Sequence, residues 1–205
     1  MKHQQKIKDI LLRANNMLIV AERGYSDLAG EDPAAYNSGL MNVATFGRAV
    51  TNVLQNLRSV VEHFDDWYMP KQEEMRSSPV CRHFYKIRSD ILKRGESGTS
   101  VTVHLFSSPG TMDELIAAAG APPTDNAEFV IGGRFSGSGW LIRHADGSED
   151  VFYVSLPEEL AITKVVVSDT AREESVRGKN IVDLAREYLD YLRLLVQDAK
   201  HRFSS

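Results

Sequence analysis

The 205-residue chain has a single cysteine, Cys81, and no apolar run long enough to cross a bilayer. A lone cysteine excludes an intramolecular disulfide and a cysteine-rich zinc site, and it fits a reducing compartment. The stretch Met1–Arg13 is polar and amphipathic, unlike a signal peptide. We therefore expect a cytoplasmic protein that makes no membrane contact.

The chain also lacks an excess of basic residues, since its formal net charge at pH 7 is −4. This charge argues against a protein that coats nucleic acid through overall basicity, although a local basic patch can still hold phosphates. The length suits one domain, and no internal repeat or low-complexity tract divides it. We therefore treat residues 1–205 as a single domain.

Apolar residues recur at helical spacing through the N-terminal half. The segment Ile7–Leu18 predicts a first helix with one buried face, and the composition of Gly24–Gly39 is typical of a loop. The apolar stripe from Val43 to Phe64 then predicts one helix of about six turns. Trp67-Tyr68 ends that helix, and Pro70 fits the first turn of a short continuation.

Capping residues mark two further helices. Ser78-Pro79 predicts the start of a third helix, which Gly95 ends. Asn180 predicts the start of a last helix, whose apolar face we expect to pack on the first three. These helices give a bundle formed by residues 1–97 and 178–203.

Between the bundle segments, residues 98–170 change to a period of two and predict a β-rich insert. Asp146-Gly147 predicts a hairpin turn, and Thr111–Glu114 has the spacing of a capping box that opens a short helix ending at Gly120. The expected strands are Val101–Phe106, Glu128–Arg134, Trp140–Arg143, Val151–Leu156 and Ile162–Val167. The predicted fold class is α+β, an antiparallel four-helix bundle with an antiparallel β-sheet inserted between the third and last long helices.

The segment Arg88–Gly95, with the sequence Arg-Ser-Asp-Ile-Leu-Lys-Arg-Gly, resembles the end of a helix in the HEPN family. The family name refers to higher eukaryotes and prokaryotes nucleotide-binding. In that family a long helix precedes one that closes with Arg-Asn-x-x-x-His. Arg88 stands at the family's arginine, Ser89 at its asparagine and Lys93 at its histidine. The resemblance covers residues 40–95 and the last helix, but not the insert.

The resemblance implies a HEPN-like four-helix bundle and a homodimer with a shared RNA-cleaving site. In such a site the arginine stabilises charge on the phosphate while the histidine moves a proton from the ribose 2′-hydroxyl. A lysine stays protonated near neutral pH and is a poor base. We therefore expect binding of RNA or a nucleotide with weak or absent cleavage and no cofactor. The candidate residues are Arg82, His83, Arg88, Lys93 and Arg94, with Arg88 and Lys93 at the catalytic positions.

Two alternatives stay open. His83 could replace the missing base and preserve an active ribonuclease, but it lies five positions before Arg88, and a surface histidine is the simpler interpretation. The helix cations are also explained by solvation and by the helix dipole. In that case the protein is a structural or regulatory interaction module whose insert supplies the partner surface.

Three other patterns are less specific. The run His63–Asp66 contains metal-ligand residue types without the i, i+4 spacing of a helical metal site, so no metal is expected. Gly132-Gly133 and the run Ser-Gly-Ser-Gly at 136–139 lack the Walker lysine-serine ending and predict a flexible connection between strands. Trp67 and Tyr68 could stack on bases, but core packing is the simpler interpretation.

Overall fold

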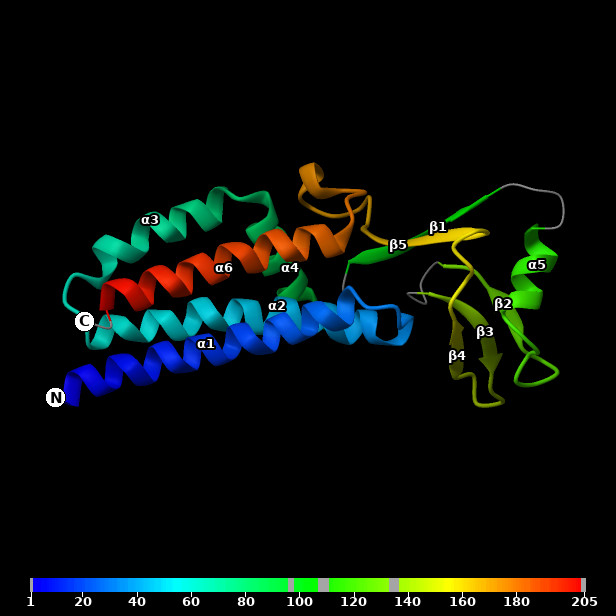
Figure 1. The fold of residues 1–205 in the computed structure, drawn as a ribbon, viewed down its shortest axis with the longest axis horizontal. Helices are drawn as coiled ribbons and strands as arrows, with labels where there is room; N and C mark the ends of the chain where they lie inside the picture. Colours follow the sequence, from blue (N-terminus) through cyan, green and yellow to red (C-terminus); the bar gives the residue numbers. More distant parts are fainter. Residues whose placement is uncertain (1, 96–97, 107–110, 133–136, 204–205) are drawn as a thin grey trace.

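The computed structural model describes residues 2–95, 98–106, 111–132 and 137–203. Long helices gather at one end of an elongated molecule and the β-rich insert lies at the other (Figure 1). The insert contains two small antiparallel sheets. The predicted α+β class is therefore confirmed, but the single inserted sheet is wrong. None of the helices in the described part of the chain is both long and apolar enough to span a membrane.

The first two helices lie antiparallel and close together. α1 (Lys2–Leu28) continues beyond the predicted loop boundary, and α2 (Tyr36–Leu54) begins before its end, after the short 3-10 helix η1 (Pro33–Ala35). The predicted loop at 24–39 is therefore wrong at both ends. Gly24 and Gly39 sit where the helices touch, because a Cβ on Gly39 would lie 2.6 Å from Leu28 N and 2.7 Å from Gly24 O.

The apolar stripe from Val43 to Phe64 does not form one helix, contrary to the prediction. After α2 the chain passes through a 3-10 helix, η2 (Gln55–Ser59), and His63 adopts a left-handed backbone conformation with φ 56°. The spacing of apolar residues persists through this turn, which conceals the break from a periodicity argument. α3 (Phe64–Ser77) follows, and Pro70 lies within it rather than in its first turn.

The third predicted helix is confirmed as α4 (Pro79–Arg94). Ser78 Oγ accepts a hydrogen bond from Cys81 N at 3.2 Å, which caps the first turn. At the other end, Gly95 has φ 71° and donates its N–H to Ile91 O at 2.9 Å. Both ends therefore follow from local sequence signals.

The insert begins with β1 (Thr99–Leu105), which pairs with β5 (Ala161–Val167). The second sheet has the order β2–β3–β4, with β2 at Glu128–Val130, β3 at Ser138–Arg143 and β4 at Glu149–Val154. A short helix, α5 (Thr111–Ala118), lies between β1 and β2.

The predicted hairpin between β3 and β4 is confirmed. Gly147 has φ 83° and Asp146 Oδ1 accepts from Ser148 N at 2.9 Å. β2 ends earlier than the predicted strand, and residues 133–134 of that prediction lie outside the described residues. The predicted flexible connection lies partly outside them too. It is wrong at its end, because Ser138 and Gly139 belong to β3.

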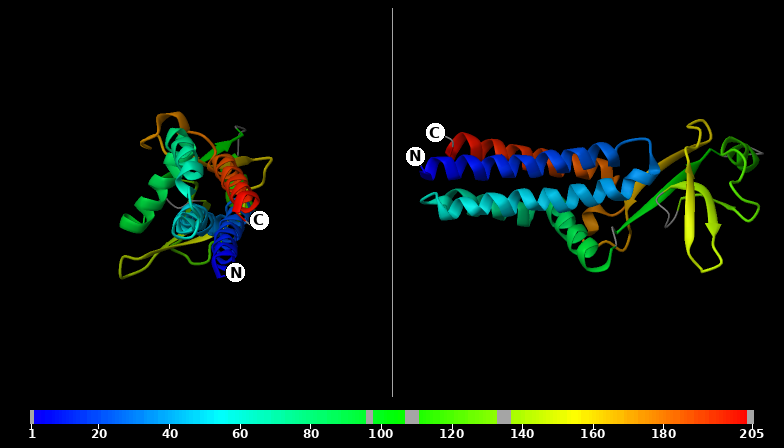
Figure 2. Two further views of the ribbon diagram at one scale, coloured as in Figure 1. Left: turned by 90° about the vertical axis from the view of Figure 1, so that its left-hand side faces the viewer. Right: turned by 90° about the horizontal axis from the view of Figure 1, so that it is seen from below.

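The last helix, α6 (Ile181–Phe203), packs on α1, α2 and α4 as expected. Asn180 Oδ1 accepts from Val182 N at 2.8 Å and caps it. Figure 2 shows α1, α2 and α6 running alongside one another while α4 projects from them. Val165 and Val167 of β5 join the same buried core, so the bundle's packing extends into the insert.

Candidate functional site

The five candidate residues lie on α4 but do not converge on one point. Arg88 is half-buried, whereas Lys93 and Arg94 are exposed. Residues five apart on an α-helix point about 140° away from each other, so Arg88 and Lys93 do not share a face. An RNA strand could therefore contact both side chains only by curving around α4, or one of the two contacts would come from a second copy of the chain.

Arg82 is already engaged. Its Nε lies 3.0 Å from Glu173 Oε1 and its Nη2 lies 2.8 Å from Glu173 Oε2, a bidentate ion pair. Its Nη1 donates to the backbone oxygens of Arg76 at 2.7 Å and Ser77 at 3.1 Å. Arg82 therefore links the segment before α6 to the start of α4. Its guanidinium donors are used in these contacts and are not available to a phosphate. No sequence pattern indicates this pair, because Glu173 lies 91 positions from Arg82.

His83 is buried, with 4% of its surface exposed, so the interpretation as a surface histidine is wrong. Its Nε2 has no hydrogen-bond partner in the described part of the chain. Burial lowers the pKa of His83 below 6.5, while the charge of Glu173 offsets part of that change. The ring is neutral near pH 7, and its burial leaves little of it accessible to a ligand.

Two more cations of α4 share one carboxylate. Asp90 accepts from Lys86, and Arg94 Nη2 lies 2.8 Å from Asp90 Oδ1. These i, i+4 pairs neutralise part of the basic charge that the sequence places on α4. Arg88 and Lys93 form no ion pair with any described residue.

Arg88 flanks an exposed apolar strip. Tyr85 and Leu92, at 56% and 57% exposure, lie two helical turns apart and so share one face of α4. Ser89, at the asparagine position of the HEPN motif, donates its hydroxyl to Tyr85 O at 3.0 Å. The Ser89 hydroxyl therefore uses its donor within the backbone of α4.

The other sequence patterns have structural roles. Asp65 forms an ion pair with Arg58 at 2.7 Å, and no group of three or more potential metal ligands occurs among the residues described. Trp67 is buried, and its Nε1 donates to Asp198 Oδ2 at 2.9 Å. Its ring packs edge-on against Phe203, which fits the core interpretation.

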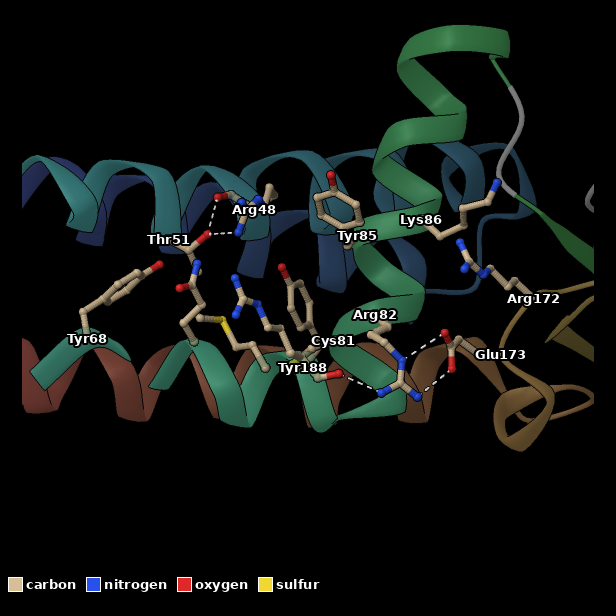
Figure 3. A pocket seen from close by; sticks show the side chains of 13 residues that line it. Arg48, Thr51, Tyr68, Cys81, Arg82, Tyr85, Lys86, Arg172, Glu173 and Tyr188 are labelled. Atoms are coloured by element: carbon tan, nitrogen blue, oxygen red, sulfur yellow. Dashed lines mark hydrogen bonds and ion pairs between the residues drawn. The ribbon is translucent and has the colours of Figure 1, made fainter. Parts of the chain in front are cut away.

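A cavity of about 630 Å³, which was not predicted from the sequence, lies beside α4. Side chains from α2, α3, α4 and α6 surround it, together with the segment before α6 (Figure 3). The signal in the sequence was Arg48, a cation within the apolar stripe of α2. Burial raises the pKa of the Cys81 thiol at its edge, so this cysteine is a poor nucleophile at neutral pH.

Comparison with known proteins gives one partial match. Residues 15–108 match the model of a family described as bacteriophage lambda protein ea47. The match covers somewhat less than half of the chain and spans α4 with every candidate residue, but not α6. No curated protein and no solved structure matches significantly. The chain is thus similar to the phage family from the middle of α1 to the end of β1.

Proposed function

We propose that the protein is a HEPN-like homodimer that binds single-stranded RNA through α4 without cleaving it. The carrying observation is that Arg88 and Lys93, the two motif positions, are the α4 cations left without an ion pair among the described residues. Unpaired cations on a solvated helix can exchange their counterions for RNA phosphates. Arg82, Lys86 and Arg94 have carboxylate partners and contribute less to this binding.

The absence of efficient cleavage follows from the groups around the motif. Lys93 is an exposed ammonium group, which can neutralise a phosphate through its charge. Buried His83 is not placed to accept a proton from RNA at the surface of α4. A site that neutralises phosphate but lacks a general base binds its ligand more effectively than it cleaves it.

A homodimer through α4 is supported by the exposed strip of Tyr85 and Leu92 beside Arg88. A two-fold contact uses the same surface on both copies, so antiparallel packing of two such strips would be self-complementary. It would also place an arginine from each copy near the axis. This arrangement solves the problem that Arg88 and Lys93 of one chain point in different directions.

The binding test is fluorescence anisotropy with a labelled single-stranded RNA. We expect Arg88→Ala to raise the Kd by about tenfold at low salt, because it removes a phosphate contact in each copy. Arg13→Ala, at an exposed site on α1, is the matched control and should leave the Kd unchanged. Equal binding by both variants, or no binding by the wild type, would remove the proposal.

The same samples test catalysis. Labelled RNA incubated with the wild-type protein should remain intact on a denaturing gel. Fragments that disappear with Arg88→Ala would instead show an active ribonuclease with a non-standard base.

A second candidate is a protein-interaction module, favoured by apolar side chains exposed on the insert. They are Leu105, Phe106, Met112, Ile116, Phe152 and Ile162. Exposed apolar groups of this kind mark interaction surfaces when they are contiguous. Phe152→Ser should then weaken capture of a protein partner while leaving RNA binding intact. Unchanged capture would count against the insert as a partner surface.

A further inference from the structure

The cavity beside α4 carries far more positive than negative charge. Its lining contains five cations and one acid. The acid, Glu173, is neutralised by Arg82, and Lys86 is paired with Asp90. The lining cations are Arg48, Arg76, Arg82, Lys86 and Arg172. Arg76 Nη1 lies 3.7 Å from Glu73 Oε2, so it is partly neutralised as well. After these pairs are discounted, Arg48 and Arg172 still leave an excess of positive charge that favours an anion.

Arg48 is held in position by neighbours that leave most of its donors unused. Its Nη1 donates to Thr51 Oγ1 at 2.8 Å, and the Thr51 hydroxyl donates to Arg48 O at 2.9 Å. The guanidinium carbon lies 5.5 Å from the centre of the Tyr85 ring. A guanidinium fixed by one hydrogen bond and one aromatic ring loses little further freedom when it binds an oxyanion.

Tyr68 adds a buried donor to the same cavity. Its side chain is 1% exposed, and its hydroxyl has no hydrogen-bond partner among the described residues. Thr51 and Gln55 lie near this hydroxyl, but both side chains have other partners. Thr51 Oγ1 accepts a hydrogen bond from Arg48, and Gln55 Nε2 donates to Thr51 O at 3.3 Å. Burial raises the pKa of Tyr68, while the charge of Arg48 and the nearby side chains of Gln55 and Thr51 offset part of the rise. The hydroxyl therefore keeps its proton and can donate it to a ligand oxygen.

The remaining walls suit an apolar or aromatic body attached to the anion. Met75 and the rings of Tyr85 and Tyr188 line the cavity, and Figure 3 shows Tyr85 and Tyr188 on either side of the space next to Arg48. A buried polar group without a partner is destabilising, and a ligand oxygen at Tyr68 would remove that cost. The volume of about 630 Å³ is typical of small-molecule sites and exceeds the needs of a free phosphate ion.

We propose that this cavity binds an organic phosphate of nucleoside-monophosphate size, with Arg48 and Tyr68 donating to the phosphate oxygens and Tyr85 contacting the organic part. The cavity lining does not include Arg88 or Lys93, but Tyr85 belongs both to this lining and to the exposed strip proposed for the dimer contact. Binding in the cavity does not depend on the RNA-binding function, although both sites lie along α4. Arg172 and Lys86 at the other end of the cavity add long-range attraction for the anion (Figure 3).

The test is isothermal titration calorimetry with adenosine, cytidine, guanosine and uridine 5′-monophosphates, ribose 5-phosphate, adenosine and inorganic phosphate. We expect at least one nucleoside monophosphate to bind at least about tenfold more tightly than adenosine or inorganic phosphate. Binding of ribose 5-phosphate as tight as that of the nucleotides would show that the base contributes nothing, which overturns the nucleotide-sized ligand.

Variants locate the binding. Arg48→Gln should raise the Kd by about tenfold or more, because it removes the fixed guanidinium. Tyr68→Phe removes only the hydroxyl and should raise the Kd several-fold. The control is Arg58→Gln, an arginine of η2 paired with Asp65 outside the cavity, which should bind as the wild type does. If Arg48→Gln does not fold, Tyr68→Phe and Arg48→Lys carry the same test.

Two results would overturn the proposal. One is no heat of binding from any of the four nucleoside monophosphates at about 1 mM, a level that detects even weak ligands. The other is binding that Arg48→Gln and Tyr68→Phe both leave unchanged. Arg88→Ala separates the two proposals, because it should abolish most RNA binding and leave nucleotide binding intact.

Discussion

Replacing Gly39 by alanine tests whether α1 and α2 are packed at backbone contact. The added Cβ would lie 2.6 Å from Leu28 N and 2.7 Å from Gly24 O. Both are backbone atoms, so no change of side-chain rotamer can relieve the overlap. The two helices would have to move apart along much of their shared length, which would also loosen the core residues between them.

The expected magnitude combines two opposing effects. Alanine within a helix is favoured over glycine by about 0.8–1 kcal/mol, whereas overpacking costs about 1–3 kcal/mol. Because both atoms it would meet belong to the backbone, we place the overlap in the upper part of that range. The net loss is then about 1–2 kcal/mol in the free energy of unfolding. A chain of this length loses about 2–4 °C of Tm per kcal/mol.

The assay is urea unfolding followed by circular dichroism, with thermal scans for comparison. Asn37→Ala, an exposed substitution two residues earlier in α2, is the control and should be neutral or slightly stabilising. Gly24→Ala should act through the same contact, so the double variant should lose less than the two single losses added together. A Gly39→Ala protein as stable as the wild type would refute close packing at this point.

Three further predictions concern α4. Burial lowers the pKa of His83, so the unfolded chain takes up a proton first and the free energy of unfolding falls as the pH drops below 6.5. His83→Leu should reduce that fall, measured by urea unfolding at pH 7.5, 6.5 and 5.5. The same dependence of stability on pH in both proteins would contradict this. Ser78→Ala removes the cap of α4 and should cost about 1 kcal/mol by the same measurement, whereas Ser78→Gly should cost less. Glu173→Gln breaks the bidentate pair with Arg82 and should speed tryptic cleavage near Arg177, with equal cleavage rates in the two proteins as the opposing result.

Local signals predicted the ends of α4 and α6 well. The caps at Ser78, Gly95 and Asn180 contact groups only a few positions away, so their effects can be predicted from the local sequence. Glycines at 24 and 39 misled the prediction because a glycine can mark either a turn or a close approach of two helices. Only the neighbouring helix distinguishes these meanings, and it is defined by the fold.

The site was harder to predict because its partners come from distant segments. Glu173 reaches Arg82 across 91 positions, and it turns an apparently free cation into a structural tie. The cavity needs side chains from four helices, of which only Arg48 looks unusual in its own segment. His83 was misjudged for the same reason, since its burial depends on the segment that returns from the insert.

The pairing of β1 with β5 has a consequence for how this chain can diversify. The chain leaves α4 along β1 and returns toward α6 along the adjacent antiparallel strand β5. These two strands form a stem that carries the segment between Leu105 and Ala161. Changing the length of such a connection costs little, because loop-closure entropy grows only with the logarithm of length. Residues 106–160 can therefore be exchanged as a cassette while Val165 and Val167 remain to seal the core. The helical part would then serve as a constant frame, with recognition altered by replacing what the stem carries.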